Sequence, residues 1–143
     1  MTKRREVLRK TRLFITSLTK RYAIILDLGC GRGEFTYFML YKTPNILPIG
    51  MDPDFKELKK GKKFKIDLVF AVREYLPFRT NAFDGIFINE VLEHVEDEDR
   101  VLNEVWRTLR DKGLLYISAP NKFALFDHHG MHISYTRIPN LLG

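Results

Sequence analysis

Glycine alternates with other residues in the segment Asp27-Leu28-Gly29-Cys30-Gly31-Arg32-Gly33. Glycines at this spacing let the backbone turn sharply and pass directly beneath a ligand, where side chains would obstruct it. The apolar run Ala23-Ile24-Ile25-Leu26 precedes the segment and has the composition of a parallel strand covered on both faces. Open α/β sheets bind ligands at the carboxyl ends of such strands. The sequence therefore predicts a small-molecule site on this segment, which we call the glycine loop (residues 27–33).

The glycine spacing and the residue that follows narrow the choice of ligand. Dinucleotide sites use G-x-G-x-x-G and place a pyrophosphate on the next helix N-terminus, whereas this loop reads G-x-G-x-G and Glu34 follows it. A carboxylate there would repel a phosphate, and the Gly-Lys-Ser/Thr of a P-loop is absent. A ligand with an adenosine, no phosphate and a cationic end, such as S-adenosylmethionine, meets neither objection. Asp52, nineteen residues after Gly33, can accept both ribose hydroxyls, and the alternative is a plain tight turn beside a surface acid.

A second group of residues could bind a metal ion. Glu90, Glu93 and His94 have spacings of three and four, so they share a face if their segment is helical. His132 follows later and is expected beside the same edge of the sheet. Two carboxylates with one or two imidazoles suit Mg²⁺, Mn²⁺ or Zn²⁺. The alternative is that His94 is structural or faces the substrate and that the later histidines bind no metal.

The hydrophobic pattern predicts elements that position these residues. A basic amphipathic helix is expected at 3–20 and further helices at 34–41, after Pro53 and at 97–111, the last with Gly113 as its C′ glycine. Strands are expected at 22–27, 47–51, 68–71, 85–88 and 114–117, with loop beyond.

This alternation of strands and helices predicts an α/β fold. We expect a Rossmann-like, open, mostly parallel sheet of about five strands with helices on both faces, giving three α/β/α layers. The chain contains no repeat or linker, so residues 1–143 are expected to form one domain. Within it, 1–21 would be the basic N-terminal helix, 22–118 the cofactor-binding core and 119–143 a C-terminal loop or short helix.

Composition excludes several classes of protein. No apolar run approaches the ~18 residues of a membrane span, and no secretory pattern opens the chain, so a cytoplasmic protein without membrane contact is expected. The single cysteine excludes an intrachain disulfide. The net charge of +6 is concentrated in residues 3–21 and 56–65. Composition alone favours a solvated lysine-rich surface there, and attraction of RNA is the alternative.

Four segments together resemble the class I S-adenosylmethionine-dependent methyltransferases of the type 11 group, over about residues 22–137. The glycine loop looks like the family's first motif, and the others lie around strand four and strand five: Asn81-Ala82-Phe83-Asp84-Gly85-Ile86, Val91-Leu92-Glu93-His94-Val95 with Leu109-Arg110-Asp111-Lys112-Gly113-Leu114-Leu115, and Ser118-Ala119-Pro120-Asn121.

The resemblance implies a cofactor, S-adenosylmethionine, and roles for individual residues. The backbone from Gly29 to Gly33 would cradle the methionine end, and Asp27 would orient that loop. The residues implied to bind the cofactor are Asp27, Gly29, Cys30, Gly31, Gly33, Met51, Asp52, Pro53, Val72, Arg73, Asn89 and Glu90, with Asp52 on the ribose, Met51 and Pro53 beside the adenine, and Asn89 and Glu90 near the sulfonium.

Two departures from the family's pattern are visible. Val72, with Arg73 beside it, stands where family members commonly carry an aspartate that binds the adenine amino group. The sequence also ends at Gly143, before the usual sixth and seventh strands are expected. The alternatives are a reduced domain, a fragment of a longer protein, or completion of the sheet by a homodimer or a partner subunit.

The resemblance implies direct in-line transfer of a methyl group, for which the protein mainly aligns the reactants. Glu90 is the first candidate for the catalytic base, His94 the second, and a metal-activated hydroxyl the third. The acceptor could be a small molecule or RNA. The alternative function is a non-catalytic subunit that binds S-adenosylmethionine or acts as a scaffold in a larger methyltransferase complex.

Overall fold

The computed structural model of the chain describes Arg5, Arg9 and residues 22–41, 43–89, 91–119, 122–127 and 132–137. For residues 39, 40, 119, 122–127 and 132–137 it describes the backbone only. The helix predicted at 3–20 lies outside the described residues except for Arg5 and Arg9, which are helical and exposed. No helix in the described part of the chain is long and apolar enough to cross a bilayer.

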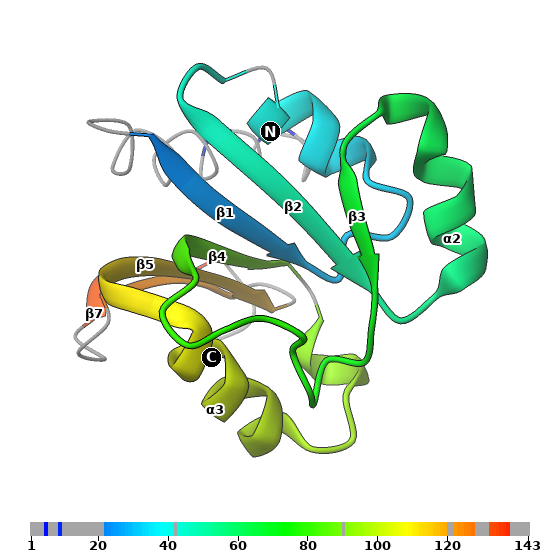
Figure 1. Cartoon of the computed structure of the whole chain (residues 1–143). Helices are drawn as coiled ribbons and strands as arrows, with labels where there is room; N and C mark the ends of the chain where they lie inside the picture. The colour runs from blue at the N-terminus through cyan, green and yellow to red at the C-terminus, as the bar shows by residue number, and fades with distance from the viewer. Residues whose placement is uncertain are drawn as a thin grey trace.

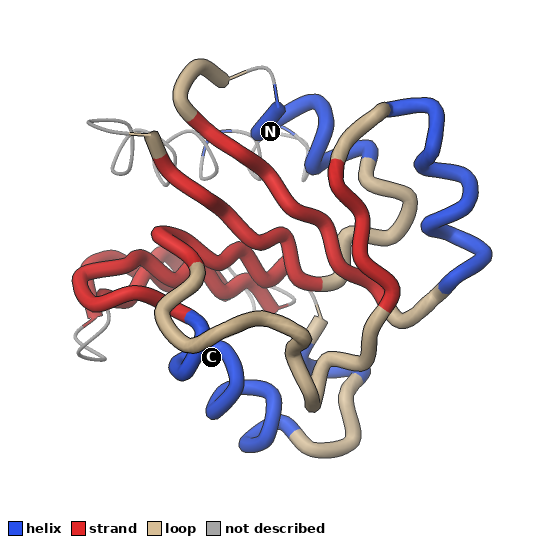
Figure 2. Tube along the Cα trace, viewed as in Figure 1, coloured by secondary structure: helices blue, strands red, loops and turns tan. Residues whose placement is uncertain are grey.

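A single sheet in the order β3-β2-β1-β4-β5-β6-β7 forms the centre of the molecule (Figures 1 and 2). Its first five strands run parallel, which confirms the predicted α/β fold. These strands are β1 (Ala23–Leu28), β2 (Ile46–Asp52), β3 (Asp67–Phe70), β4 (Phe83–Asn89) and β5 (Leu109–Ala119). From β1 the chain adds β2 and β3 on one side and then β4 and β5 on the other. The carboxyl end of β1 therefore lies at the topological switch point, where such sheets bind ligands.

Helical segments connect the parallel strands. They are the π-helical η1 (Thr36–Tyr41), α2 (Phe55–Lys60), the 3₁₀ segments η2 (Gly61–Phe64) and η3 (Leu92–His94), and α3 (Glu98–Thr108). Side chains cap the two α-helices, because Asp54 accepts hydrogen bonds from Lys56 N and Glu57 N and Asp97 accepts one from Arg100 N. Helical segments are thus present at each of the three predicted places, 34–41, after Pro53 and 97–111, but their ends differ from those predicted.

The C-terminal end of α3 differs from the prediction. The helix stops at Thr108, and Gly113 lies within β5 instead of serving as a C′ glycine. The carbonyls of Arg107 and Thr108 accept hydrogen bonds from the backbone of Asn81 and Ala82. A neighbouring segment thus satisfies the free carbonyls of the helix end, and no glycine turn is needed there.

The prediction of a loop or short helix at 119–143 was wrong for residues 122–127 and 132–137, which are the described part of that range beyond β5. β6 (Lys122–Asp127) pairs antiparallel with β5, and β7 (His132–Arg137) pairs antiparallel with β6. The sheet therefore has seven strands instead of about five, and it continues past β5 within this chain. Short strands of this kind gain their structure largely from backbone pairing with their neighbours, so their sequences carry only a weak local pattern.

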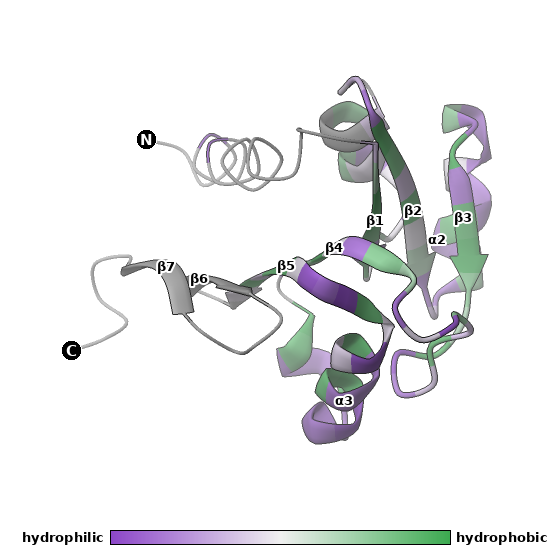
Figure 3. Cartoon of the chain, turned by 60° about the vertical axis from the view of Figure 1, so that its left-hand side comes forward, coloured by the Kyte–Doolittle hydropathy of each residue, from purple (hydrophilic) through white to green (hydrophobic). Residues whose placement is uncertain are grey.

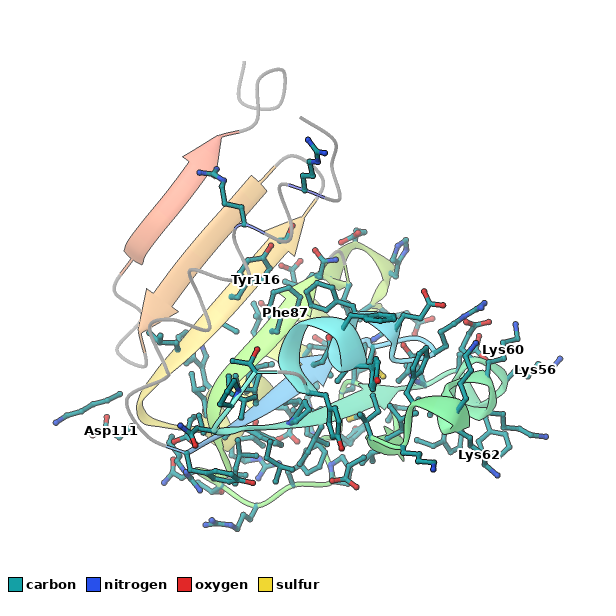
Figure 4. The ribbon with its side chains drawn as sticks, turned by 90° about the horizontal axis from the view of Figure 1, so that it is seen from above. Lys56, Lys60, Lys62, Phe87, Asp111 and Tyr116 are labelled. Atoms are coloured by element: carbon teal, nitrogen blue, oxygen red, sulfur yellow. The ribbon has the colours of Figure 1, made fainter. Side chains whose placement is uncertain are left out.

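Helices on both faces give the three layers that the sequence predicts. α3 covers the face that carries the larger core, which includes Leu26, Leu28, Met51, Ile86, Ile88, Val101, Val105 and Leu115. On the opposite face Phe35, just before η1, packs against Ile25, Ile46, Phe87 and Tyr116, and Figure 4 shows the last two side by side. Figure 3 shows hydrophobic central strands and hydrophilic outer surfaces on α2 and α3.

Candidate active site

The glycine loop leaves the carboxyl end of β1 in a conformation that requires glycine. Gly29, Gly31 and Gly33 have φ angles of +84°, +58° and +82°, which L-residues rarely adopt. Gly29 N and Cys30 N both donate to the carbonyl of Met51, at 2.7 and 3.0 Å. The neighbouring strand β2 therefore holds the glycine loop at the carboxyl end of the sheet.

The first two glycines face different surroundings. A Cβ on Gly29 would overlap the Cγ2 atom of Val91, so backbone and side chain are already in contact there. A Cβ on Gly31 would have no atom within 4 Å. The space beside Gly31 is open, as a loop that passes beneath a ligand requires.

Asp52, at the end of β2, binds both the glycine loop and the turn that follows β2. Its Oδ2 accepts a hydrogen bond from Gly31 N at 2.9 Å, and its Oδ1 accepts one from Asp54 N at 2.8 Å. The side chain is buried, with Arg73 Nη2 4.0 Å from Oδ2. Since two carboxylate oxygens offer about four acceptor sites, capacity remains for hydroxyl groups of a ligand.

A second buried carboxylate, Asp27, lies at the start of the glycine loop. Thr36 Oγ1 donates to its Oδ2 at 2.5 Å. Burial raises the pKa of Asp27 to about 6, the hydrogen bond from Thr36 opposes this shift, and the charge of Asp52 adds to it. Two carboxylates that influence each other in this way disfavour a phosphate and favour a cationic group. Glu34, which carries the sequence argument against a dinucleotide ligand, is exposed. The two buried carboxylates give a second electrostatic reason against such a ligand.

Cys30 packs inward beneath the loop. A Cβ on Gly50 would come within 2.8 Å of its sulfur, so the thiol fills the space that Gly50 leaves. Burial, together with the charges of Asp27 and Asp52, raises the pKa of the Cys30 thiol far above its ordinary value. The thiol is therefore a structural group in the site and not a nucleophile.

The expected adenine-binding residues lie at the carboxyl ends of β2 and β3. Met51 is fully buried in the core, so its contribution at the loop is its carbonyl. Pro53 is partly exposed, and Val72 is exposed. Sequence reasoning missed Phe55 and Phe70, whose exposed rings meet edge to face with centroids 5.4 Å apart, while Phe70 pairs in register with Asp52.

Arg73 and Asn89 carry polar atoms with no partner among the described residues. Arg73 Nε and Asn89 Oδ1 are both buried without a hydrogen bond. Asn89 ends β4, which pairs with β1, so it lies at the same sheet edge as the glycine loop. Buried unpaired polar atoms are costly, and a bound ligand is one way to satisfy them.

The other predicted catalytic and metal-binding residues are only partly described. Glu90 and the side chain of His132 lie outside the described residues. His94 ends η3 with a largely exposed side chain, and its Nε2 is 3.7 Å from Glu93 Oε1. Among the described residues no three His, Cys, Asp or Glu side chains form a group that could hold a metal ion. The metal hypothesis therefore gains no support from the structure.

Two ion pairs that sequence reasoning did not predict hold the site's framework. Arg110 Nη1 contacts both oxygens of Asp84, at 2.9 and 3.0 Å, and Asp84 also accepts from Ile24 N at the start of β1. Glu104 and Arg107 of α3 form the second pair, and Arg107 donates hydrogen bonds to carbonyls of the segment before β4. The Phe83-Asp84 motif is thus explained by a structural role.

Comparison with known proteins agrees with this geometry. Residues 26–117 match the model of a family described as a methyltransferase domain. The chain is 36% identical over 96 residues to a malonyl-[acyl-carrier protein] O-methyltransferase of Legionella pneumophila, covering 64% of this chain and 34% of that protein. It is 30% identical over 128 residues to a tRNA U34 carboxymethyltransferase of Campylobacter curvus, covering 82% and 41%. The chain thus spans less than half the length of either relative.

The fold has solved counterparts as well. The crystal structure of the [4+2]-cyclase SpnF matches with a TM-score of 0.68 at 22% identity, over 77% of this chain and 44% of that one. At that identity the likeness concerns the fold alone. The family match spans most of the chain and includes the glycine loop, Asp52 and the strands that place them, so this chain belongs to the methyltransferase domain family.

Proposed function

We propose that this chain is an S-adenosylmethionine-dependent methyltransferase that acts by direct in-line transfer. The observation that carries the proposal is the contact between Gly31 N and Asp52 Oδ2, 2.9 Å apart, beside the open space at Gly31. It brings together a glycine with open space beside it and a buried acceptor for hydroxyl groups, at the switch point of the sheet.

The residues present fit this cofactor. Its ribose hydroxyls suit the remaining acceptor sites of Asp52, and its positive charge suits the pair formed by Asp27 and Asp52. Asn89 Oδ1 offers a buried acceptor that has no partner among the described residues. When bound, S-adenosylmethionine supplies a methyl group already activated by a positively charged sulfur.

The chain's own residues would bind and orient. The backbone of the glycine loop, fixed by Met51 O, would hold the methionine end, and the exposed rings of Phe55 and Phe70 would flank the adenine with Pro53. Arg73 would approach from the β3 side, where Val72 offers no carboxylate. Glu90 remains the proposed base and His94 its substitute, since each can take a proton from an acceptor.

The acceptor class stays open between RNA and a small molecule. One relative bears a name that refers to tRNA, and another bears a name that refers to an acyl-carrier protein. A homodimer or a partner subunit remains a prediction of the sequence, although the sheet already has seven strands within this chain. A cytoplasmic location and a divalent metal held by Glu90, Glu93, His94 and His132 remain predictions of the sequence.

Calorimetric titration with S-adenosylmethionine and S-adenosylhomocysteine tests the cofactor. Asp52→Asn should weaken binding about tenfold or more, because a hydrogen bond to a charged group is lost. Asp54→Asn is the matched control, since it removes a nearby carboxylate while asparagine still caps α2. Absence of binding by the unaltered chain at high micromolar cofactor would contradict the proposal.

Transfer itself is tested with radiolabelled S-adenosylmethionine and fractions of RNA and of small metabolites. Label in either fraction identifies the acceptor class. Cofactor binding without label in any fraction would instead favour the non-catalytic subunit.

A further inference from the structure

A dense group of lysines covers α2, η2 and the residue after them. Lys56, Lys59, Lys60, Lys62, Lys63 and Lys65 are all exposed. Only Lys60 forms an ion pair with a described residue, which is Glu57. Figure 4 shows Lys56, Lys60 and Lys62 projecting outward from the same side of the molecule. We call these six residues the lysine stripe. It carries five positive charges with no opposite charge bound to them within the described part of the chain.

Aromatic side chains flank both ends of the stripe. At the β3 end of η2, Phe64 stacks on Tyr37 at 5.1 Å and meets Phe38 at 6.1 Å, and Lys63 Nζ lies 5.3 Å from the Phe64 ring centre. Phe38 and Tyr41 are 56% and 52% exposed, and although Tyr41 stacks on Tyr37 at 5.6 Å through one face, each ring retains exposed surface for a ligand. At the other end Lys59 Nζ lies 5.7 Å from the ring centre of Phe55.

The combination selects a kind of partner. Lysines alone suit any polyanion, but exposed rings beside them add flat apolar surfaces on which unpaired bases stack. A base-paired duplex hides its bases from such rings. An anionic membrane would require a continuous apolar face that enters the lipid, whereas here charged residues lie between the two aromatic groups. Charge and ring placement together favour a flexible anionic chain with free bases.

We propose that the lysine stripe and the rings of Phe38 and Tyr41 form a docking surface for single-stranded nucleic acid. Phosphates would pair with the lysines, and bases would stack on the two exposed rings of η1. The surface lies outside the glycine loop and needs no bound cofactor, so the inference stands independently of methyl transfer.

Fluorescence anisotropy with a labelled RNA of about 12 nucleotides tests the surface, a length within the usual range of site sizes. Five unpaired lysines predict a salt slope near −3.5, so affinity should fall about a hundredfold between ~50 and ~200 mM salt. A flat salt response, or tighter binding to phosphatidylserine vesicles or to a duplex of the same sequence, would overturn the proposal.

Two variants separate the parts of the surface. Lys56→Gln with Lys62→Gln should weaken RNA binding about twentyfold at ~0.1 M salt and reduce the slope by about 1.4. The matched control is Arg79→Gln with Lys112→Gln, which removes the same charge from exposed positions. Lys112 neighbours Asp111, at the opposite end of the molecule in Figure 4. An equal loss in both double variants would show that only net charge matters and would refute the docking surface.

Phe38→Leu tests stacking. Leucine keeps an apolar side chain but lacks a ring face, so binding should weaken about tenfold if bases stack there. Unchanged RNA affinity would remove the ring from the proposal. Cofactor titration of each variant checks that the glycine loop is intact.

Discussion

Gly29 and Gly31 of the glycine loop differ in the space that is available for a side chain. Gly29 has a positive φ and contact with Val91, so Gly29→Ala should cost several kcal/mol of unfolding free energy, from about 1–3 kcal/mol of backbone strain plus the overlap. Gly31→Ala should cost only about 1–2 kcal/mol, because its Cβ enters open space. Urea denaturation measures both.

Cofactor titration should give an informative result for Gly31→Ala, which remains folded. The added methyl group would occupy the space proposed for the ligand, so affinity should fall at least tenfold. Equal stability loss in the two variants, or unchanged affinity in Gly31→Ala, would contradict this assignment of the open space.

The buried carboxyl of Asp27 makes stability depend on pH. Its pKa is raised from 3.8 to about 6, so the folded state binds a proton more tightly than the unfolded state does. Stability from this group therefore falls as pH rises from about 4 to about 6, and the cost persists above pH 6, on the order of 3 kcal/mol.

Asp27→Asn should remove that cost. The variant should be more stable than the unaltered chain above pH 6, with a difference that shrinks toward zero near pH 4. Urea denaturation of both proteins between pH 4 and pH 8 isolates the difference, because all other titrating groups are shared. A pH-independent difference would refute the assignment to Asp27.

Among the elements, α3 supports the segment that precedes β4. Arg107 donates to the carbonyls of Leu76 and Phe78 at 3.1 and 2.9 Å, and Glu104 accepts from Leu76 N at 2.8 Å. The planar guanidinium reaches both carbonyls at once, whereas a lysine ammonium cannot reproduce this fork.

Arg107→Lys should therefore lower the unfolding free energy by about 1–2 kcal/mol despite the conserved charge. Arg100→Lys is the control on the same helix, because Arg100 makes one exposed side-chain hydrogen bond and a contact with the Tyr75 ring that a lysine ammonium can also make. It should change stability by less than about 0.5 kcal/mol. Denaturation midpoints compare the two, and equal midpoints would contradict the role of the fork.

The parallel elements could be predicted because each carries its own signal. The buried strands β1 and β4 read as continuous apolar runs, and α3 shows apolar residues at helical spacing. β6 and β7 were not predicted although each pairs with the strand directly before it in the chain, because their sequence lies among turn-forming residues that favour a loop. The end of α3 was misplaced for a different reason, because its last carbonyls bind a distant segment.

The sequence could predict which candidate residues lie together where each of them directly follows a strand. The glycine loop and Asp52 each follow a strand, so their approach follows from the parallel sheet. The pairing of Asp84 with Arg110, 26 residues apart, and the inward orientation of Cys30 depend on packing. Surface rings such as Phe70 give no sequence signal that distinguishes them from core residues.

Across the whole molecule, stability should decrease from the centre of the sheet to its edges. β1 and β4 are paired on both sides and fully buried at Ile25, Leu26 and Ile86, whereas β3 is an edge strand with partly exposed residues. In native-state hydrogen exchange, amides of β1 and β4 should exchange only on global unfolding. Amides of β3 should exchange through smaller openings, and equal protection across the sheet would contradict this order.

The packing of Cys30 against Gly50 makes the reactivity of this thiol a reporter of the position of the glycine loop. Because Cys30 is the only cysteine, a thiol-specific dye can report on one position without any engineering. The thiol is only partly exposed and its pKa is raised, so it reacts slowly while the glycine loop is seated, and the labelling rate should increase when that loop lifts from the sheet. A ligand that fastens the loop should slow labelling in proportion to its occupancy, which offers a direct assay for candidate cofactors even before any acceptor is identified.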